Sequence, residues 1–110
     1  MKDLTLTTFR MEVENSELPC VIKFYKDTCW MCKDLEHPYI QLKDEFEGQY
    51  NFFVIDDDAE EELGTLFDID GVPSIYVYSK DTGMVEIPFP AGDGYTYEYL
   101  YDFLDEHDYL

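Results

Sequence analysis

The sequence has little positive charge. Its 110 residues include 26 acidic side chains and only 7 lysines and arginines, which gives a formal net charge of −19 at pH 7. A chain this acidic is repelled by phosphate backbones and by anionic lipid headgroups, so we expect no nucleic-acid partner and no membrane association. The charge predicts a well-solvated surface, although a salty environment or a basic partner protein would also account for it.

Long apolar runs are also missing. No run approaches the length of about 18 residues that a membrane-spanning helix needs. The early acid Asp3 and the lack of an apolar segment near Met1 argue against a secretory signal, so we expect a cytoplasmic protein. The sequence contains no repeat, low-complexity segment or linker, and 45% of its residues are hydrophobic. We therefore expect one folded domain over residues 1–110.

Cysteine is scarce. Three cysteines are too few for a disulfide-stabilised scaffold, and their number is odd. Cys29 and Cys32 form a Cys-x-x-Cys pair, whereas Cys20 lies alone in an apolar stretch. This usage is typical of a reducing compartment in which the pair carries out chemistry and the single thiol packs in the core.

Hydrophobic patterning predicts alternating strands and helices. The apolar runs 20–25 and 52–55 predict buried strands, because runs without alternation are typical of a parallel sheet covered on both faces. Residues 31–47 predict a helix between them. The apolar face of this helix carries Leu35, Tyr39, Leu42 and Phe46.

The rest of the chain extends this pattern. The further predicted elements are a strand over 1–6, a helix over 7–15, a helix over 59–67, strands over 74–78 and 84–87, and a helix over 97–106. The helix over 59–67 should bury Leu63, Leu66 and Phe67 on one side. The last two strands should pair antiparallel across a short turn. The predicted fold is an α/β sandwich with a mixed sheet.

The Cys-Trp-Met-Cys segment falls where the first buried strand leads into the long helix. Cys29 would then lie at the helix N-terminus, where free backbone N–H groups and the helix dipole stabilise a thiolate. A thiolate is the nucleophile in thiol–disulfide exchange, and Cys32, one turn deeper, can resolve a mixed disulfide at Cys29. Lys26 and Lys33 lie close by and are expected to favour the thiolate, although both also fit ordinary surface positions.

Two segments resemble the thioredoxin superfamily. One is the run 24–33, a strand that leads into Cys-x-x-Cys-Lys, and the other is Gly-Val-Pro at 71–73, at the interval from Cys32 that thioredoxins use. The resemblance covers roughly residues 19–106. It implies a thioredoxin fold, with a central mixed β-sheet flanked by helices on both faces.

The resemblance also implies a substrate-binding surface around the cysteine pair. Pro73 is expected to be cis and to face the pair, and Val72 is expected to pair its backbone with an extended substrate. Trp30 and Met31 lie between the cysteines, where family members present side chains to substrate. Trp30 could be an apolar docking surface or could fold back over Cys29, and the sequence leaves both open.

The chain departs from thioredoxins at one buried position. Thioredoxins have an aspartate six residues before the first cysteine, which moves the proton of the resolving thiol, and this chain has Lys23 there. Lys23 with a lowered pKa, Asp27 or a water molecule could take that role. Lys26 and the segment 92–94 are instead similar to glutaredoxins, so we interpret the chain as a divergent member between the two branches.

These features predict a small dithiol–disulfide oxidoreductase without a cofactor. We expect a monomer that acts on a disulfide-containing protein and is recharged by a reductase or by glutathione. The alternative is a thioredoxin-fold adaptor with little redox turnover, whose 10 tyrosines and acidic surface suit an interface. A zinc module is a further alternative, but Cys29, Cys32 and His37 supply only three of the four ligands that such a site takes.

Overall fold

The chain forms a five-stranded mixed sheet with helices on both faces. The computed structural model describes residues 1–107. The elements are β1 (Lys2–Asp3), α1 (Leu6–Phe9), the π-helical turn η1 (Arg10–Glu14), β2 (Cys20–Tyr25), α2 (Trp30–Glu45), β3 (Asn51–Asp56), α3 (Glu61–Leu66), β4 (Ser74–Ser79), β5 (Gly83–Ile87) and α4 (Tyr97–Glu106). Their order confirms the predicted succession of strands and helices. The predicted domain continues to residue 110, and residues 108–110 lie outside the described part.

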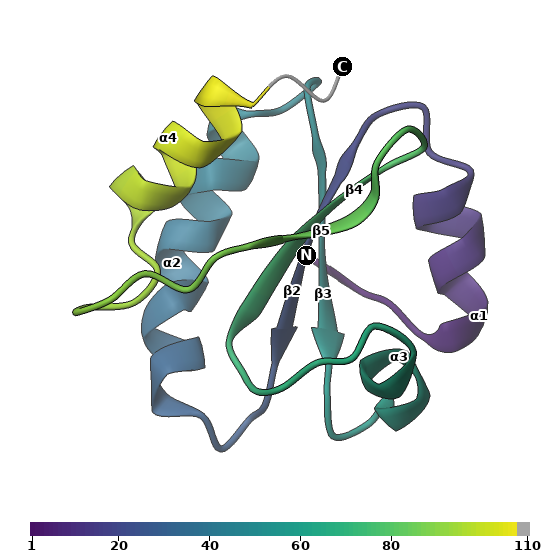
Figure 1. The fold of residues 1–110 in the computed structure, drawn as a ribbon, viewed down its shortest axis with the longest axis horizontal. Coiled ribbons are helices and arrows are strands. Elements are labelled where there is room, and N and C mark those ends of the chain that lie inside the picture. The colour runs from purple at the N-terminus through teal and green to yellow at the C-terminus, as the bar shows by residue number, and fades with distance from the viewer. Residues whose placement is uncertain (108–110) are drawn as a thin grey trace.

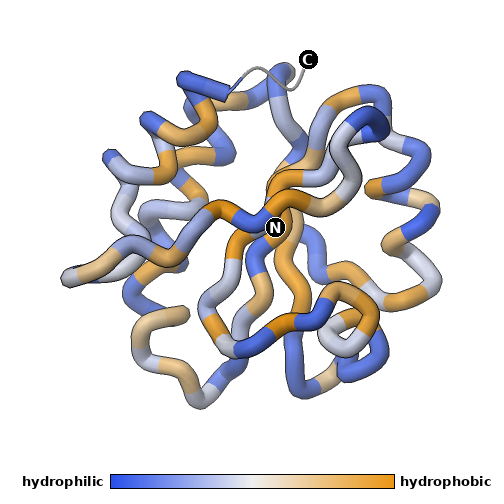
Figure 2. The backbone as a smooth tube through the Cα atoms, in the orientation of Figure 1, coloured by the Kyte–Doolittle hydropathy of each residue, from blue (hydrophilic) through white to orange (hydrophobic). Residues whose placement is uncertain are grey.

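The sheet has the strand order β1-β3-β2-β4-β5. Strands β1, β3 and β2 run parallel, β4 is antiparallel to β2, and β5 is antiparallel to β4. Helices α2 and α4 cover one face, and α1, η1 and α3 cover the other (Figure 1). The hydrophobic segments gather along the central strands and the hydrophilic ones on the outer turns of the helices (Figure 2). Among residues 1–107, no helix is long and apolar enough to span a membrane.

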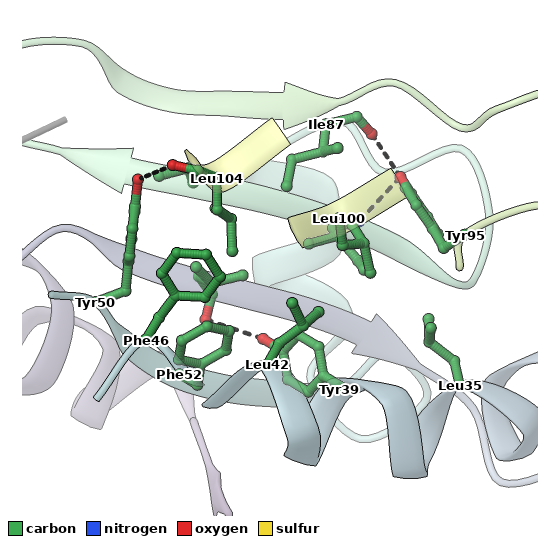
Figure 3. Packing of buried hydrophobic residues seen from close by; sticks show 13 residues of the cluster. Leu35, Tyr39, Leu42, Phe46, Tyr50, Phe52, Ile87, Tyr95, Leu100 and Leu104 are labelled. Atoms are coloured by element: carbon green, nitrogen blue, oxygen red, sulfur yellow. Dashed lines mark hydrogen bonds between the residues drawn. The ribbon is translucent and has the colours of Figure 1, made fainter. Parts of the chain in front are cut away.

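The face under α2 and α4 holds the larger cluster of buried side chains (Figure 3). The predicted apolar face of α2 is confirmed, because Leu35, Tyr39, Leu42 and Phe46 are all buried. The buried hydroxyl of Tyr39 donates to the backbone carbonyls of Val21 (3.1 Å) and Phe53 (2.8 Å). These bonds satisfy a polar group that would be costly to bury alone, and they tie α2 to β2 and β3.

The opposite face is covered by shorter elements. Cys20 alternates with Ile22 and Phe24 along β2, and all three are fully buried in this second cluster, as predicted for Cys20. From α3, Leu63 packs into the same cluster. The prediction that Leu66 is buried is wrong, because its side chain is 64% exposed. With 6 residues, α3 makes fewer than two turns, so only Leu63 reaches the sheet.

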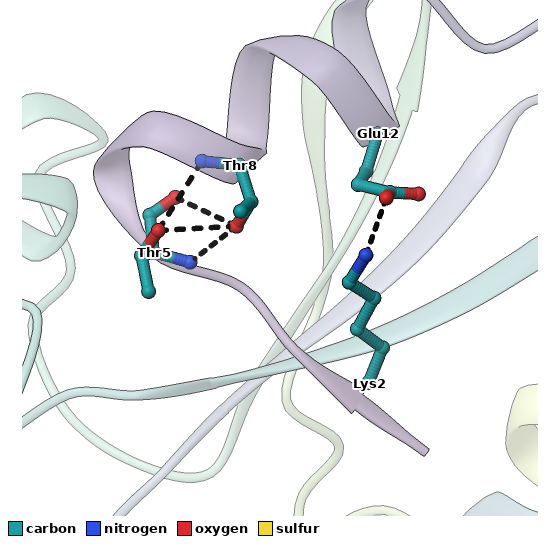
Figure 4. A network of polar contacts seen from close by, with 4 residues as sticks. All are labelled: Lys2, Thr5, Thr8 and Glu12. Carbon is teal, nitrogen blue, oxygen red and sulfur yellow. Dashed lines mark hydrogen bonds and ion pairs between the residues drawn. The ribbon is translucent and has the colours of Figure 1, made fainter.

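The N-terminal segment differs from the prediction. Instead of one helix over 7–15, a short α1 starts at Leu6 and gives way to η1, where the Asn15 N–H donates to the carbonyl of Arg10, five residues back (3.2 Å). The early start has a clear cause, because Thr5 and Thr8 form a reciprocal capping box (Figure 4). This box ends the preceding strand sooner than predicted, and Lys2 of that strand pairs with Glu12 of η1.

Candidate functional site

The Cys29–Cys32 segment lies at the junction of β2 and α2. Cys29 is the N-cap residue of α2, and its sulfur accepts a hydrogen bond from the backbone N–H of Cys32 (3.2 Å). The first N–H groups of a helix have no acceptor within the helix, so a sulfur here receives a donor and the positive end of the dipole. The structure therefore places the Cys29 sulfur at the N-terminus of α2, the position expected from the sequence.

The two cysteines differ in exposure. Cys29 is partly exposed, whereas Cys32 is only 3% exposed, and both are free thiols. Burial raises the pKa of the Cys32 thiol to about 11, with a further contribution from its hydrogen bond to Cys29. Near neutral pH, Cys29 is thus the thiol that a partner can reach, and Cys32 is a protonated thiol held one turn deeper.

The loop before β4 lies against Cys29. The Cys29 thiol donates to the carbonyl of Val72 at a sulfur–oxygen distance of 3.9 Å, and the Val72–Pro73 peptide bond is cis. Pro73 is buried and Val72 partly buried. A backbone carbonyl of this loop therefore faces the partly exposed sulfur, and the fold brings it there from 43 residues along the chain.

A small cleft of about 80 Å³ opens between the cysteine segment and this loop. Its lining residues are Trp30, Met31, Asp34, Leu35, Pro73, Asp93 and Tyr95. The Trp30 side chain is 70% exposed, so it forms an open wall of the cleft. The predicted substrate-binding residues Trp30, Met31 and Pro73 thus share one surface hollow, and Val72 lies beside it.

The two lysines expected to tune the thiolate lie in different settings. The ammonium of Lys26 is 3.7 Å from a carboxylate oxygen of Asp58 and 3.9 Å from one of Asp57. Its charge is therefore shared with two acids that directly follow β3. Lys33 is exposed in the first turn of α2. Their influence on Cys29 stays a prediction.

Lys23 is buried beneath α2. Its side chain is 4% exposed, and its ammonium lies 4.7 Å from the centre of the Tyr39 ring, a cation–π distance. It lines a cavity of about 300 Å³ together with Asp27 and Glu36. Burial lowers the pKa of Lys23, while Glu36, Cys32 and Cys29 act in the opposite direction. A buried lysine thus occupies the interior position near the cysteine pair.

Four residues of the cleft were not predicted as site residues: Asp34, Leu35, Asp93 and Tyr95. Leu35 was expected only on the buried face of the helix, and Asp93 belongs to the segment 92–94 that is similar to glutaredoxins. Helical spacing could have identified Asp34, because it follows Trp30 by four residues and therefore lies beside it on α2. Asp93 and Tyr95 come from the loop between β5 and α4, and only the tertiary structure brings them to Trp30.

His37 is exposed, and within residues 1–107 no three histidine, cysteine or acidic side chains are grouped as metal ligands.

Comparisons with known proteins identify a family for this chain. The Thioredoxin family model matches residues 1–93. Protein disulfide-isomerase A4 of Rattus norvegicus is 29% identical over 102 residues, which cover 91% of this chain and 16% of that protein. An uncharacterized protein of Schizosaccharomyces pombe is 31% identical over 106 residues, which cover 93% of this chain and 14% of that protein. The chain therefore spans less than a fifth of the length of these two relatives.

A solved structure shows the same fold. Chloroplastic thioredoxin z superposes with a TM-score of 0.81, covering 96% of this chain and 92% of that chain, at 17% sequence identity.

Proposed function

The chain belongs to the thioredoxin family of thiol–disulfide oxidoreductases, and from this premise we propose that it reduces or exchanges disulfides of protein substrates through Cys29 and Cys32. One observation carries the proposal: a partly exposed sulfur at the N-cap of α2 accepts the N–H of a second, buried cysteine. The similarity to protein disulfide-isomerase A4 supports it.

The first step uses Cys29. Its thiolate attacks one sulfur of the substrate disulfide, so a bond forms between Cys29 and that sulfur while the substrate S–S bond breaks. The departing substrate sulfur leaves with the bonding electron pair and takes up a proton from water. The backbone of Val72, whose carbonyl already faces Cys29, lies where it can pair with the extended substrate strand.

The second step uses Cys32. Cys32 passes its proton to water, and its thiolate attacks the Cys29 sulfur. The Cys29–Cys32 disulfide forms while the bond between Cys29 and the substrate breaks, and the second substrate sulfur leaves as a thiolate. The pair is then oxidised by two electrons and the substrate is reduced to two thiols. The buried ammonium of Lys23 stabilises the Cys32 thiolate in this step, because it lowers the pKa of that thiol. A dithiol reductase or glutathione would restore the pair.

Insulin reduction tests the proposal. The reduced protein, kept reduced by dithiothreitol, should accelerate precipitation of the insulin B chain, and a Cys29→Ser/Cys32→Ser double variant should not. A Cys32→Ser variant should instead accumulate a mixed disulfide at Cys29, which electrophoresis without reductant and mass mapping would identify. A wild-type protein that binds partners but shows no turnover would favour the adaptor function over the oxidoreductase.

A further inference from the structure

The cleft beside Cys29 combines an aromatic wall with two carboxylates from distant parts of the chain. Trp30 and Asp34 are neighbours on the first turns of α2, and Asp93 reaches the cleft from the loop between β5 and α4. Its volume of about 80 Å³ exceeds the roughly 30 Å³ that one water occupies, so it has room for the end of one long side chain.

The loop that bears Asp93 is fixed in place. Gly94 has φ +75°, and a Cβ added there would lie 3.1 Å from Cε of Met31 and 2.9 Å from Cζ of Phe89, so the backbone packs directly on both side chains. The next residue, Tyr95, donates its hydroxyl to the carbonyl of Ile87 (Figure 3) and packs its ring against Phe89, with ring centroids 5.1 Å apart. Asp93 is therefore held at a defined place relative to the cysteine segment.

Neither carboxylate forms an ion pair within the described residues. Within residues 1–107, the ion pairs join Lys2 to Glu12, Arg10 to Glu14, and Lys26 to Asp57 and Asp58, and none includes Asp34 or Asp93. Both side chains are exposed, so they keep their charge available to a partner. An exposed indole that shares a cleft with two such carboxylates matches the chemistry of a guanidinium or ammonium group.

We propose that this cleft binds an arginine or lysine side chain adjacent to the reactive cysteine of the substrate. The cation stacks on Trp30 and pairs with Asp34 and Asp93, while the cysteine next to it faces Cys29. Substrates with basic residues beside their disulfide are therefore preferred, and those with acidic residues there are rejected by like charge. The inference rests on the proposed function and names the substrate class of the same site.

Matched peptides test the preference. Three tryptophan-free peptides with one internal disulfide would differ only in the residues that flank the first cysteine, which are arginine, glutamine or glutamate. Trp30 is the single tryptophan, so its fluorescence in a stopped-flow instrument follows oxidation of the reduced protein. At low ionic strength the arginine peptide should react about tenfold faster than the glutamate peptide, and the ratio should shrink in high salt.

Two double variants separate the cleft from the overall charge. Asp34→Asn/Asp93→Asn should bring the arginine-to-glutamate ratio close to one. Glu17→Gln/Asp81→Asn changes the net charge equally at exposed positions in the loops at the opposite end of the sheet, and it should keep most of the ratio. Each rate is divided by that variant's rate with the uncharged bis(2-hydroxyethyl) disulfide, so that a general change in thiol reactivity cancels.

The outcomes distinguish this inference from the proposed function. If the wild-type protein reduces all three peptides at one rate, or if both double variants lower the ratio equally, the cleft is not a specificity site although the oxidoreductase function stands. If the wild-type protein oxidises with none of the disulfides, the proposed function itself fails. Gly94→Ala is strained at φ +75° and crowds the ends of the Phe89 and Met31 side chains, so it should lower the ratio as well.

Discussion

The start of α2 and the interior of β2 hold cysteines in opposite physical settings. Cys29 caps a helix, accepts a backbone N–H and is partly exposed. Cys20 lies on β2, the central strand of the sheet, under α1 and α3 with no exposed surface, and burial raises the pKa of its thiol. The same residue type thus occupies a partly exposed helix end and a fully buried strand position, nine residues apart. What differs is access to solvent and the donors that the backbone offers to a thiolate.

The largest expected effect is on disulfide reduction, from a substitution of the cysteine at the helix end. Replacing Cys29 by serine should abolish insulin reduction, because no other exposed thiol occupies a helix N-cap in residues 1–107. Cys20→Ala is the matched control and should keep the rate close to that of the wild type. If Cys29→Ser retained the activity and Cys20→Ala lost it while folded, the roles given to the two regions would be reversed.

Selective alkylation sharpens the comparison without mutation. With limiting iodoacetamide near pH 7, the label on the reduced protein should map mainly to Cys29, since Cys32 and Cys20 are buried and burial raises the pKa of both thiols. Peptide mapping by mass spectrometry gives the distribution. In denaturant the three cysteines should label about equally, and a label mainly on Cys32 in the native protein would contradict the assignment.

The stability of the fold should depend on pH through Cys32. Its pKa is about 11 in the folded state against 9.0 as the reference, so above pH 9 the unfolded chain loses this proton first. Below pH 9 the Cys32 thiol therefore has no effect on the pH dependence of stability. As the pH rises from 9 through about 11, the free energy of unfolding should fall by up to roughly 2 kcal/mol. Urea titrations of wild type and Cys32→Ala across this range should show a smaller decline in the variant. Burial also raises the pKa of Tyr76 to about 12, so part of the decline remains.

Lys23 should have a stability effect of the opposite sign. Burial lowers its pKa, so the folded state disfavours the charge, and stability is gained as the pH rises from the folded pKa toward 10.5. Lys23→Met fills the same space without a charge and should raise the free energy of unfolding by roughly 1–2 kcal/mol at pH 7. The same variant should slow release of the mixed disulfide, which quench-flow measures. A destabilised Lys23→Met with normal release would contradict both expectations.

The smallest effect concerns Cys20 itself. Cys20→Ala removes one buried sulfur from the cluster around Ile22 and Phe24 and should lower the free energy of unfolding by roughly 1–2 kcal/mol. Cys20→Ser, which buries a hydroxyl at the same place, should cost at least as much. Equilibrium urea unfolding at neutral pH checks both. A loss of disulfide exchange by a stably folded Cys20→Ala protein would show that this thiol takes part in the chemistry.

Short-range patterns determined much of this protein. The long apolar runs predicted β2 and β3, and the spacing of apolar side chains predicted α2. Because Cys29 lies between the predicted β2 and α2, its place at the start of the helix could be predicted as well. These features depend on neighbours in the chain, which is why periodicity and capping rules reach them. The Thr5–Thr8 capping box is also a local signal, and reading it would have corrected the start of α1.

The tertiary structure alone decided which distant residues share the site. The sequence does not show that Asp93 meets Trp30, because Gly94 must first pack on Met31 and Tyr95 on the sheet. Nor does it show that the Lys23 ammonium stacks on Tyr39, since that contact depends on how α2 crosses β2. Such long-range contacts depend on how whole helices, strands and loops pack together. The local sequence pattern of a segment does not specify which distant segment it will contact.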